Sequence, residues 1–366
     1  MSPKPYAPIP LAPGPVSVHP RVMEAMNRDF GAPEIEADFL PFCQAVSRKY
    51  ARLANTLNEV VLLTGEGMLG LWAGLKSCLM PGDRVLALGS GIFGDGIGEM
   101  AAGIGCEVKA LSFPYHTTLN QHLQQIEDAI KTFRPKMITA VHCETPSGTL
   151  NPLMEIGEMK KRLGVPLFYV DAVSSWGGVA IEADAWNIDI LLGGSQKCLS
   201  SPPNMTLAAV SAPAWEIMKQ VNYQGYDSLL PWHDLYQTGH CPYTPCWQGI
   251  AALNASADAI LEEGMDACFA RHLQVAAMCR EGLGKLSIKL FPDSGAVKSP
   301  TVTAAFIPAG YDFKGWQAAL RRQGLVIAGS FGPLLDKVFR LGHMGVQADP
   351  VLVQQGLAAI RTVLSE

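Results

Sequence analysis

The sequence predicts an α/β protein with a mainly parallel sheet of seven strands between helices, followed by a smaller α+β domain. From Val60 to Val210, short runs rich in β-branched residues alternate with segments of helical periodicity, which is typical of a parallel sheet. From about residue 251 this alternation gives way to a long helical stretch. The length of 366 residues also suits two domains, since a domain often has roughly 150 residues.

The first part of the chain is rich in proline, and we expect residues 1–20 to be an extended segment. The large domain is expected over residues 21–250, with a first strand at Val60–Thr64 and a helix at Met68–Leu79. The turn Pro81-Gly82-Asp83 ends that helix. The further elements are strands at Arg84–Leu88, Glu107–Leu111, Met137–Val141, Leu167–Val170, Asp189–Leu192 and Met205–Val210, and a helix at Leu153–Leu163.

Residues 251–366 are expected to form the small domain. A long helical region covers Ile250–Leu283, and a final helix covers Pro350–Leu364. The strands expected between them lie at Thr301–Ile307, Leu325–Ala328 and Val338–Leu341.

Composition excludes several classes of function. The chain has 28 Lys and Arg against 33 Asp and Glu, so it lacks the basic field that nucleic acids or anionic membranes require. Only 17% of residues are charged, which indicates a large buried surface and contact between subunits. Without a membrane-spanning apolar run or a signal peptide, we expect a cytoplasmic protein. Nine cysteines without a C-x-x-C pair indicate neither a disulfide framework nor a zinc site, and no metal is expected.

Loops that follow strands are the first places to look for a ligand site, because ligands gather at the carboxyl ends of strands in α/β sheets. Gly89 to Gly94 fits the G-x-G-x-x-G dinucleotide pattern, but it follows the second strand rather than the first, which disfavours such a cofactor. His142-x-Glu144 matches half of a zinc deaminase motif, and its P-C-x-x-C partner is missing. A serine hydrolase would need G-x-S-x-G, which is also missing.

Asp171 and Lys197 have the chemistry of a pyridoxal site. Asp171 ends one strongly apolar strand, and Lys197 lies in a Gly/Ser loop after the next. Poor solvation disfavours the ammonium form of Lys197 and suits it to form a Schiff base. An acid such as Asp171 can keep a pyridine nitrogen protonated, which makes the ring an electron sink. From these two residues alone, an ordinary ion pair remains the alternative.

Several short motifs occur in a fixed order along nearly the whole chain. They are Leu11-Ala12-Pro13-Gly14-Pro15, Glu144-Thr145-Pro146-Ser147-Gly148-Thr149, Val170-Asp171-Ala172-Val173-Ser174-Ser175, Ser195-Gln196-Lys197, Ser201-Pro202-Pro203 and Arg340-Leu341-Gly342-His343-Met344-Gly345. In this order they resemble the class V aminotransferases of pyridoxal-phosphate fold type I, the group of alanine–glyoxylate and serine–glyoxylate transaminases.

The resemblance implies that the chain holds pyridoxal 5′-phosphate, with Lys197 as the Schiff-base lysine and Asp171 at the ring nitrogen. The other cofactor contacts that it implies are Phe93 stacked on one face of the ring, Val173 on the other face, Thr145 at the ring hydroxyl, and Gln196 with the amides of Gly67 and Met68 at the phosphate.

The resemblance also implies a homodimer with its active site at the subunit interface. Thr244, and with less support Tyr243, would then reach the phosphate held by the partner subunit. The alternative interpretation is a plain turn between Pro242 and Pro245.

Arg340 resembles the family's clamp for the substrate carboxylate, and we place Gly14 beside it at that end of the site. A planar guanidinium can donate two parallel hydrogen bonds to a carboxylate and so orient the substrate. A surface ion pair is the alternative for Arg340. His343 and Met344 have no role that the sequence explains.

Glu66 departs from the family pattern, because most relatives have Ser or Thr beside the turn that receives the phosphate. Like charges in a partly buried site repel by several kcal/mol at an effective dielectric of about 20. Three options follow: the Glu66 carboxylate points away from the phosphate, the carboxyl group is protonated, or no phosphate is bound there. One branch, pyridoxamine–pyruvate transaminase, uses the unphosphorylated vitamin as a substrate and resembles this chain at Gly65–Leu71, Gln196–Leu199 and Arg340–Gly345. Against that branch, Gln196 is the ordinary phosphate-binding residue type.

The sequence thus predicts a ping-pong aminotransferase that moves an amino group from a small donor to a small 2-oxo acid, pyruvate or glyoxylate. The alternative holds no cofactor and treats pyridoxal as a substrate. A cysteine desulfurase-type lyase is less favoured, because Gly329–Lys337 has no cysteine and the last one is Cys279. A protein that has lost catalysis is disfavoured by the joint presence of Lys197, Asp171 and Arg340. Alanine, serine, aminoethylphosphonate and pyridoxamine all remain open as donors.

Overall fold

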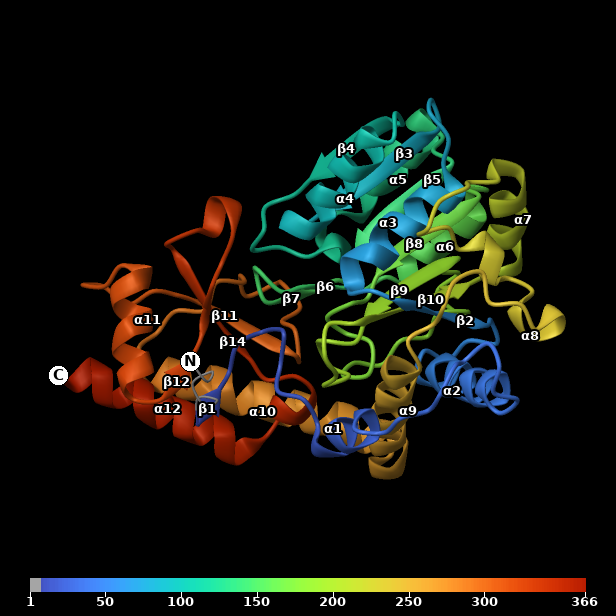
Figure 1. Cartoon of the computed structure of the whole chain (residues 1–366). Coiled ribbons are helices and arrows are strands. Elements are labelled where there is room, and N and C mark those ends of the chain that lie inside the picture. Colours follow the sequence, from blue (N-terminus) through green and yellow to red (C-terminus); the bar gives the residue numbers. More distant parts are fainter. Residues whose placement is uncertain (1–7) are drawn as a thin grey trace.

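The computed structural model describes residues 8–366, so the first seven residues of the predicted extended segment lie outside it. Figure 1 shows a large layered part, built on a central sheet, beside a smaller part that contains the C-terminus. The chain enters through the short strand β1 (Ile9–Pro10) and the helix α1 (Pro20–Met26).

The central sheet has seven strands in the order β2-β10-β9-β8-β5-β3-β4. Their bounds are β2 (Val60–Thr64), β3 (Arg84–Gly89), β4 (Glu107–Ser112), β5 (Met137–Val141), β8 (Leu167–Asp171), β9 (Ile190–Gly194) and β10 (Met205–Val210). This confirms the predicted mainly parallel sheet. Only β10 runs antiparallel to both of its neighbours. A parallel neighbour needs a crossover of a dozen or more residues, and residues 195–204 are too short for that.

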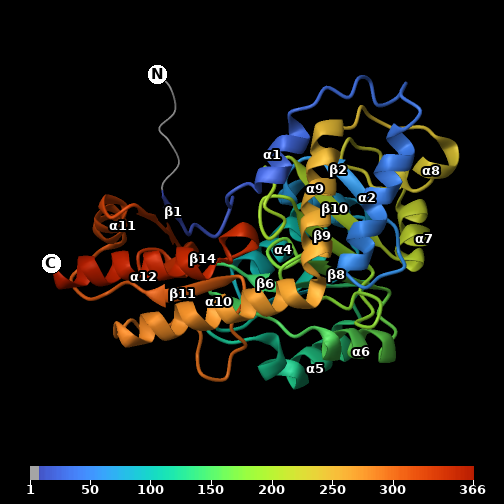
Figure 2. The ribbon, with the colours of Figure 1, turned by 90° about the horizontal axis from the view of Figure 1, so that it is seen from below.

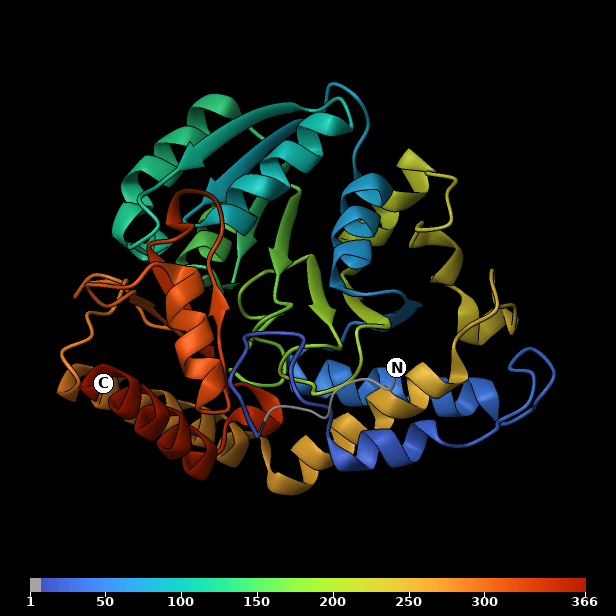
Figure 3. The same ribbon diagram turned by 60° about the vertical axis from the view of Figure 1, so that its left-hand side comes forward.

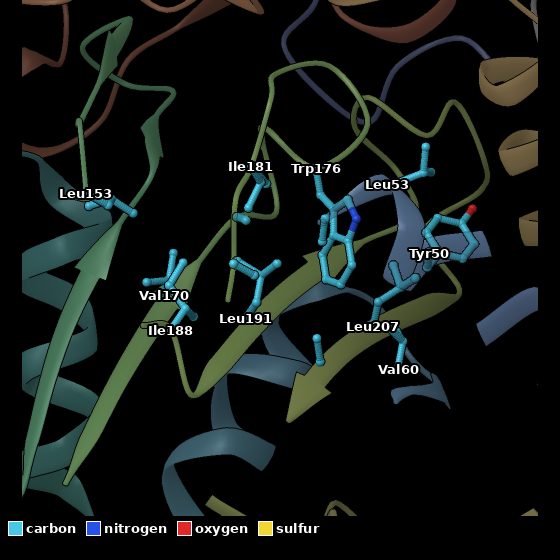
Figure 4. Packing of buried hydrophobic residues seen from close by; sticks show 14 of the residues in the cluster. Tyr50, Leu53, Val60, Leu153, Val170, Trp176, Ile181, Ile188, Leu191 and Leu207 are labelled. Carbon is cyan, nitrogen blue, oxygen red and sulfur yellow. The ribbon is translucent and has the colours of Figure 1, made fainter. Parts of the chain in front are cut away.

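Helices cover both faces of the sheet (Figure 1). One face packs against α3 (Gly67–Cys78), α4 (Ile92–Gly103) and α7 (Ala212–Val221). The other packs against α2 (Phe39–Leu53), α5 (Leu123–Phe133), α6 (Met154–Arg162) and α9 (Trp247–Glu263). Alternate strand residues point to opposite faces, so Val60 belongs to one core and Val61 to the other. Figure 4 shows the first of these cores, where Val170, Leu191 and Leu207 pack with Trp176 and Tyr50.

The smaller part is built on the antiparallel sheet β11-β14-β13. Its strands are β11 (Val302–Phe306), β13 (Ala328–Gly329) and β14 (Val338–Gly342), and its helices are α10 (Met265–Lys285), α11 (Phe313–Arg322) and α12 (Pro350–Ser365). The predicted strand at Leu325–Ala328 is instead two short strands in different sheets, since β12 (Leu325–Val326) pairs with β1.

The predicted long helical region Ile250–Leu283 consists of two helices, α9 and α10, which meet at Gly264. Gly264 has φ 89°, a left-handed conformation that ends the first helix. Figure 2 shows α9 lying along the large part and α10 running on beneath the smaller one. Among residues 8–366, no helix combines the length and the apolar character needed to cross a membrane.

The N-terminal segment runs between the two parts of the molecule (Figure 3). The amide of Leu11 donates to Val326 in β12, and Leu11 in turn accepts from Gly342 at the end of β14. A few residues later, Val16 donates to the carbonyl of Gln196. The segment therefore ties the smaller sheet to the loop that contains Lys197.

Candidate active site

A cavity of about 350 Å³ opens at the carboxyl ends of β8 and β9. Nine of the residues that the sequence singled out line it: Gly14, Glu66, Gly67, Met68, Phe93, Asp171, Val173, Gln196 and Lys197. The other lining residues are Pro15, Leu71, Cys143, Ser174 and Pro203. Because the parallel strands β8 and β9 end at the same sheet edge, residues far apart in the sequence meet there.

Lys197 is a largely buried amine without an acidic partner. Its Nζ donates to the carbonyl oxygen of Pro13 at 2.7 Å. Burial, and then the positive charge of Arg340, lowers the pKa of Lys197 to about 8, so a useful fraction of the amine is neutral near pH 7. Gly14 lies directly over this lysine with φ 118°, and a Cβ there would overlap the lysine side chain. Glycine is thus required beside Lys197, and Pro13 is a partner that the sequence did not reveal.

Asp171 is the last residue of β8 and is almost fully buried. Burial raises its pKa to about 6, opposed by the amide of Val173, which donates to Oδ1 at 2.8 Å, and by Lys197. The ordinary ion pair between Asp171 and Lys197 is not formed within the described residues, so that alternative is wrong. Asp171 is instead a carboxylate above about pH 6 that faces the cavity.

The residues around the cavity fit a pyridoxal ring. Phe93, in the first turn of α4, gives the cavity a flat apolar wall, and Val173 lines it as well. Thr145 is buried, and its hydroxyl has no hydrogen-bond partner among residues 8–366. Thr145 itself does not line the cavity and follows the lining residue Cys143 by two positions. Buried polar groups are nearly always paired, so this unpaired hydroxyl has room for a polar partner such as the ring hydroxyl.

The end of the cavity near α3 is less suited to a phosphate. Glu66 is the N-cap residue of α3, and its carboxylate accepts from Nε2 of Gln196 at 2.9 Å. Glu66 therefore faces Gln196, the side chain expected at the phosphate. The amides of Gly67 and Met68 begin the same helix and can bind an anion there. A dianionic phosphate at this helix end would meet the carboxylate of Glu66.

Arg340 lies in the middle of β14, paired with Ala304 of β11 and Ala328 of β13. Only 4% of Arg340 is exposed, and it forms no ion pair within the described part of the chain, so the surface ion pair is wrong. Its Nε donates to the carbonyl of Gly329 at 2.7 Å, and its guanidinium lies 4.8 Å from the ring centre of Phe331. These contacts orient the group and leave its two terminal nitrogens for a carboxylate. Burial lowers the pKa of Arg340 to about 10.

His343 and Met344, which the sequence left unexplained, hold the end of β14 in place. His343 is fully buried, with Nε2 2.8 Å from the hydroxyl of Thr303 and Nδ1 3.0 Å from the carbonyl of Pro300. Met344 belongs to a small buried cluster with Cys143 and Cys198. Both residues therefore support the strand that presents Arg340.

Tyr243 and Thr244 do not line the cavity that contains Lys197. They border a separate small hollow with Thr64 and Leu69, and the Tyr243 ring packs 4.5 Å from that of Tyr226. Within one chain, the structure does not bring them to the lysine.

Cys143 is the one cysteine among the residues that line the cavity, and no sequence motif assigns it a role. Its thiol lies 3.1 Å from the hydroxyl of Ser299, and burial raises its pKa to about 11. Such a thiol is not the exposed thiolate that a desulfurase needs. Among residues 8–366, no three His, Cys, Asp or Glu side chains are grouped so that they could hold a metal ion.

Comparisons with known proteins show which family the chain belongs to. The family model for class V aminotransferases matches residues 55–333. The chain is 34% identical over 358 residues to a pyridoxamine–pyruvate transaminase from Mesorhizobium japonicum, covering 96% of this chain and 90% of that protein. It is 31% identical to an (S)-ureidoglycine–glyoxylate transaminase from Bacillus subtilis, covering 97% and 90%. The crystal structure of an alanine–glyoxylate aminotransferase from Nostoc sp. matches with a TM-score of 0.94 at 28% identity, over 100% of this chain and 97% of that one.

The chain therefore belongs to the class V aminotransferase family, and it has the fold of pyridoxal-phosphate fold type I. It is a transaminase, as the sequence predicted.

Proposed function

We propose that this transaminase moves an amino group from a small amine to a small 2-oxo acid, pyruvate or glyoxylate, on pyridoxal 5′-phosphate. The main support is the buried guanidinium of Arg340, whose terminal nitrogens have no partner in the described chain and suit a carboxylate. The names of the relatives from Mesorhizobium and Bacillus include pyruvate and glyoxylate, which agrees with such an acceptor.

Most of the site residues bind the ring or the substrate, and Lys197 transfers the proton. When bound, pyridoxal supplies the aldehyde that takes up the amino group and the ring that accepts electrons from the substrate. Asp171 stabilises the protonated ring nitrogen with its carboxylate, and Phe93 and Val173 confine the ring. Lys197, released from the carbonyl of Pro13, removes or returns the proton at the substrate α-carbon through its neutral amine. Arg340 orients that carbon by holding the carboxylate attached to it.

A second candidate is the transamination of pyridoxamine itself, with pyruvate as acceptor and no cofactor held. The observation that favours it is the hydrogen bond from Gln196 to Glu66, which places a carboxylate where a phosphate would bind. The 34% identical relative from Mesorhizobium japonicum has this activity in its name.

One titration tests both candidates. The absorption spectrum of the purified protein is followed while pyridoxal 5′-phosphate or pyridoxal is added, with Lys197→Ala as the blank. If the phosphate form alone gives a tightly held new band, the first candidate is supported, and a donor screen follows. If pyridoxal binds as well or better, the second is supported. If neither form gives a band that depends on Lys197, both proposals are overturned.

Replacing Glu66 separates the candidates further. In Glu66→Gln the shape is kept and the negative charge is lost, so affinity for the phosphate form should rise about tenfold or more if that charge repels the phosphate. Affinity for pyridoxal should change much less. An unchanged ratio of the two affinities would show that Glu66 does not discriminate between the two forms.

We also propose a homodimer in which Tyr243 and Thr244 serve the site of the partner subunit. Both are exposed and border a hollow with Leu69. Met68, the chain neighbour of Leu69, is 41% exposed although it lies in the first turn of α3 and lines the cavity. An apolar side chain at this point suits coverage by a second copy of the chain.

A further inference from the structure

The carboxyl groups of Glu144 and Asp95 occupy the space beside the glycine-rich turn that precedes α4. A Cβ on Gly91 would overlap the carboxyl group of Glu144, and a Cβ on Gly89 would overlap that of Asp95. In dinucleotide-binding proteins, a turn of this pattern makes room for a phosphate at the N-terminus of the helix. Here the glycines make room for carboxyl groups from inside the protein.

Glu144 acts as a cap for α4 although it comes from another element, the short strand β6 (Cys143–Glu144). Its Oε1 accepts from the amide of Gly94 at 2.7 Å, and its Oε2 accepts from the amide of Phe93 at 3.3 Å. These amides belong to the first turn of α4, where no carbonyl within the helix can accept from them. The side chain of Glu144 is completely buried, so water does not replace it.

This contact fixes the backbone of a residue that forms the wall of the cavity. Phe93 donates its amide to Glu144, and its ring lines the cavity that contains Lys197. Thr145, with its unpaired hydroxyl, directly follows Glu144 in the chain. The residue that supports the aromatic wall is therefore the chain neighbour of a buried hydroxyl that has no partner in the described chain.

We propose that Glu144 is a positioning residue of the transaminase site: its carboxyl group holds the first turn of α4 so that the ring of Phe93 stacks on the pyridine ring. The proposal rests on the proposed function, since it assumes that a pyridoxal ring lies against Phe93. Glu144 does not touch the substrate, and it acts through Phe93.

The electrostatic surroundings favour glutamine as a conservative replacement. Burial, together with the nearby carboxylates of Asp171 and Asp95, raises the pKa of Glu144 to about 8. The neutral form is thus already accessible near pH 7. The single amide oxygen of glutamine can accept from the amide of Gly94, which makes the shorter of the two bonds, whereas its NH2 group cannot accept from Phe93. Alanine would instead leave both amides without a partner in a buried place.

A double-mutant cycle tests the proposal. Binding of pyridoxine and of pyridoxine 5′-phosphate is measured by isothermal titration calorimetry, since these alcohols cannot react with Lys197. We expect Glu144→Ala to weaken the tighter of the two complexes about tenfold or more, and Glu144→Gln, which keeps one of the two acceptor oxygens, to restore part of that loss. In a Phe93→Ala background, Glu144→Ala should have little further effect, because the two residues act as one unit.

Asp95→Asn is the matched control. Asp95 lies in the same helical turn but accepts from Ser112 and Tyr115, both at 2.6 Å, and it does not contact the amide of Phe93. Its replacement should change affinity by less than about twofold. Circular dichroism checks that each variant is folded, and Glu144→Asp, too short to reach both amides, replaces the alanine variant if that one does not fold.

The outcomes separate this proposal from the proposed function. If the wild-type protein binds neither compound, the proposed function fails. If the wild type binds and Glu144→Ala leaves the affinity unchanged, or weakens it equally with and without the Phe93 ring, the positioning role is overturned.

Discussion

At the residue scale, the site is defined by two cations that form no ion pair among residues 8–366. Lys197 donates to a backbone carbonyl and Arg340 to another, although Arg340 is buried and Lys197 is half-buried. Buried charges are normally paired, so both groups are arranged for partners that the chain does not supply. An aldehyde suits the amine, and a carboxylate suits the guanidinium.

The reaction of Lys197 with an aldehyde should follow its lowered pKa. Only the neutral amine is nucleophilic, so the rate of trapping pyridoxal should rise with pH up to about 8 and level off above it. Arg340 contributes to this shift, and Arg340→Met should therefore raise the pKa and move the profile to higher pH. Stopped-flow absorbance measures the rate. Arg322→Met, a change at an exposed position of α11, should leave the profile in place, and a profile that Arg340→Met does not move would contradict the argument.

Arg340 itself should act on the 2-oxo acid through the geometry of its hydrogen bonds. Arg340→Lys keeps the charge but loses the planar fork, and a hydrogen bond to a charged group is worth about 1.5–3 kcal/mol. We therefore expect KM for pyruvate or glyoxylate to rise roughly 10- to 100-fold, with a lower kcat because the substrate is misaligned. Steady-state kinetics checks both constants. Equal KM values for the variant and the wild type would rule out the clamp.

At the scale of elements, short-range patterns predicted most strands of the sheet but missed two features. The helical pattern from Ile250 to Leu283 continues through Gly264, so periodicity did not show where α9 ends and α10 begins. The direction of β10 also depends on the length of the loop before it and on which strand it joins. The boundary between α9 and α10 and the direction of β10 are therefore not determined by the residue pattern within these elements.

Gln347, in the turn η4 (Gly345–Gln347), should stabilise the N-terminal segment over the site. Its amide group donates to the carbonyls of Ala12 and Gly342 and accepts from the amide of Ser17. Gln347→Ala should lower the free energy of unfolding by about 1–3 kcal/mol, because these buried groups lose their partner. Chemical denaturation measures this loss, and hydrogen exchange at residues 11–19 should become faster.

Gln323→Ala serves as the control for that experiment. Gln323 donates from the surface to Glu366 at 3.3 Å, and its loss should change stability by less than about 0.5 kcal/mol. If exchange at residues 11–19 is the same in both variants, Gln347 does not hold the segment.

At the scale of the whole molecule, the cavity combines the large part, which supplies Asp171 and Lys197, with the N-terminal segment, which supplies Gly14. Arg340 comes from the smaller sheet. Arg340 does not line the cavity, but its charge acts on Lys197. The N-terminal segment is hydrogen-bonded both to the Lys197 loop and to the end of β14, and so links the two parts (Figure 3). A partner subunit would add Tyr243 and Thr244, which do not reach the cavity within one chain.

Mixing two inactive subunits tests this arrangement. Lys197→Ala lacks the reactive amine, and Thr244→Ala should weaken binding of the cofactor in the partner's site. In a hybrid dimer, one of the two sites keeps both Lys197 and Thr244, so activity at limiting pyridoxal 5′-phosphate should reappear on mixing. Light scattering should give twice the mass of one chain. A monomer, or a dimer without recovered activity, would contradict the shared site.

The sequence by itself determined the family, the sheet and the residue types of the site, because these depend on local periodicity and on ordered motifs such as Ser195-Gln196-Lys197. Only the tertiary structure decided how those residues are partnered. The bond between Gln196 and Glu66, the carbonyl of Pro13 at Lys197 and the cap that Glu144 provides for α4 all join residues at least 50 positions apart. Such contacts depend on which loops meet at one edge of the sheet, and no local pattern contains that information.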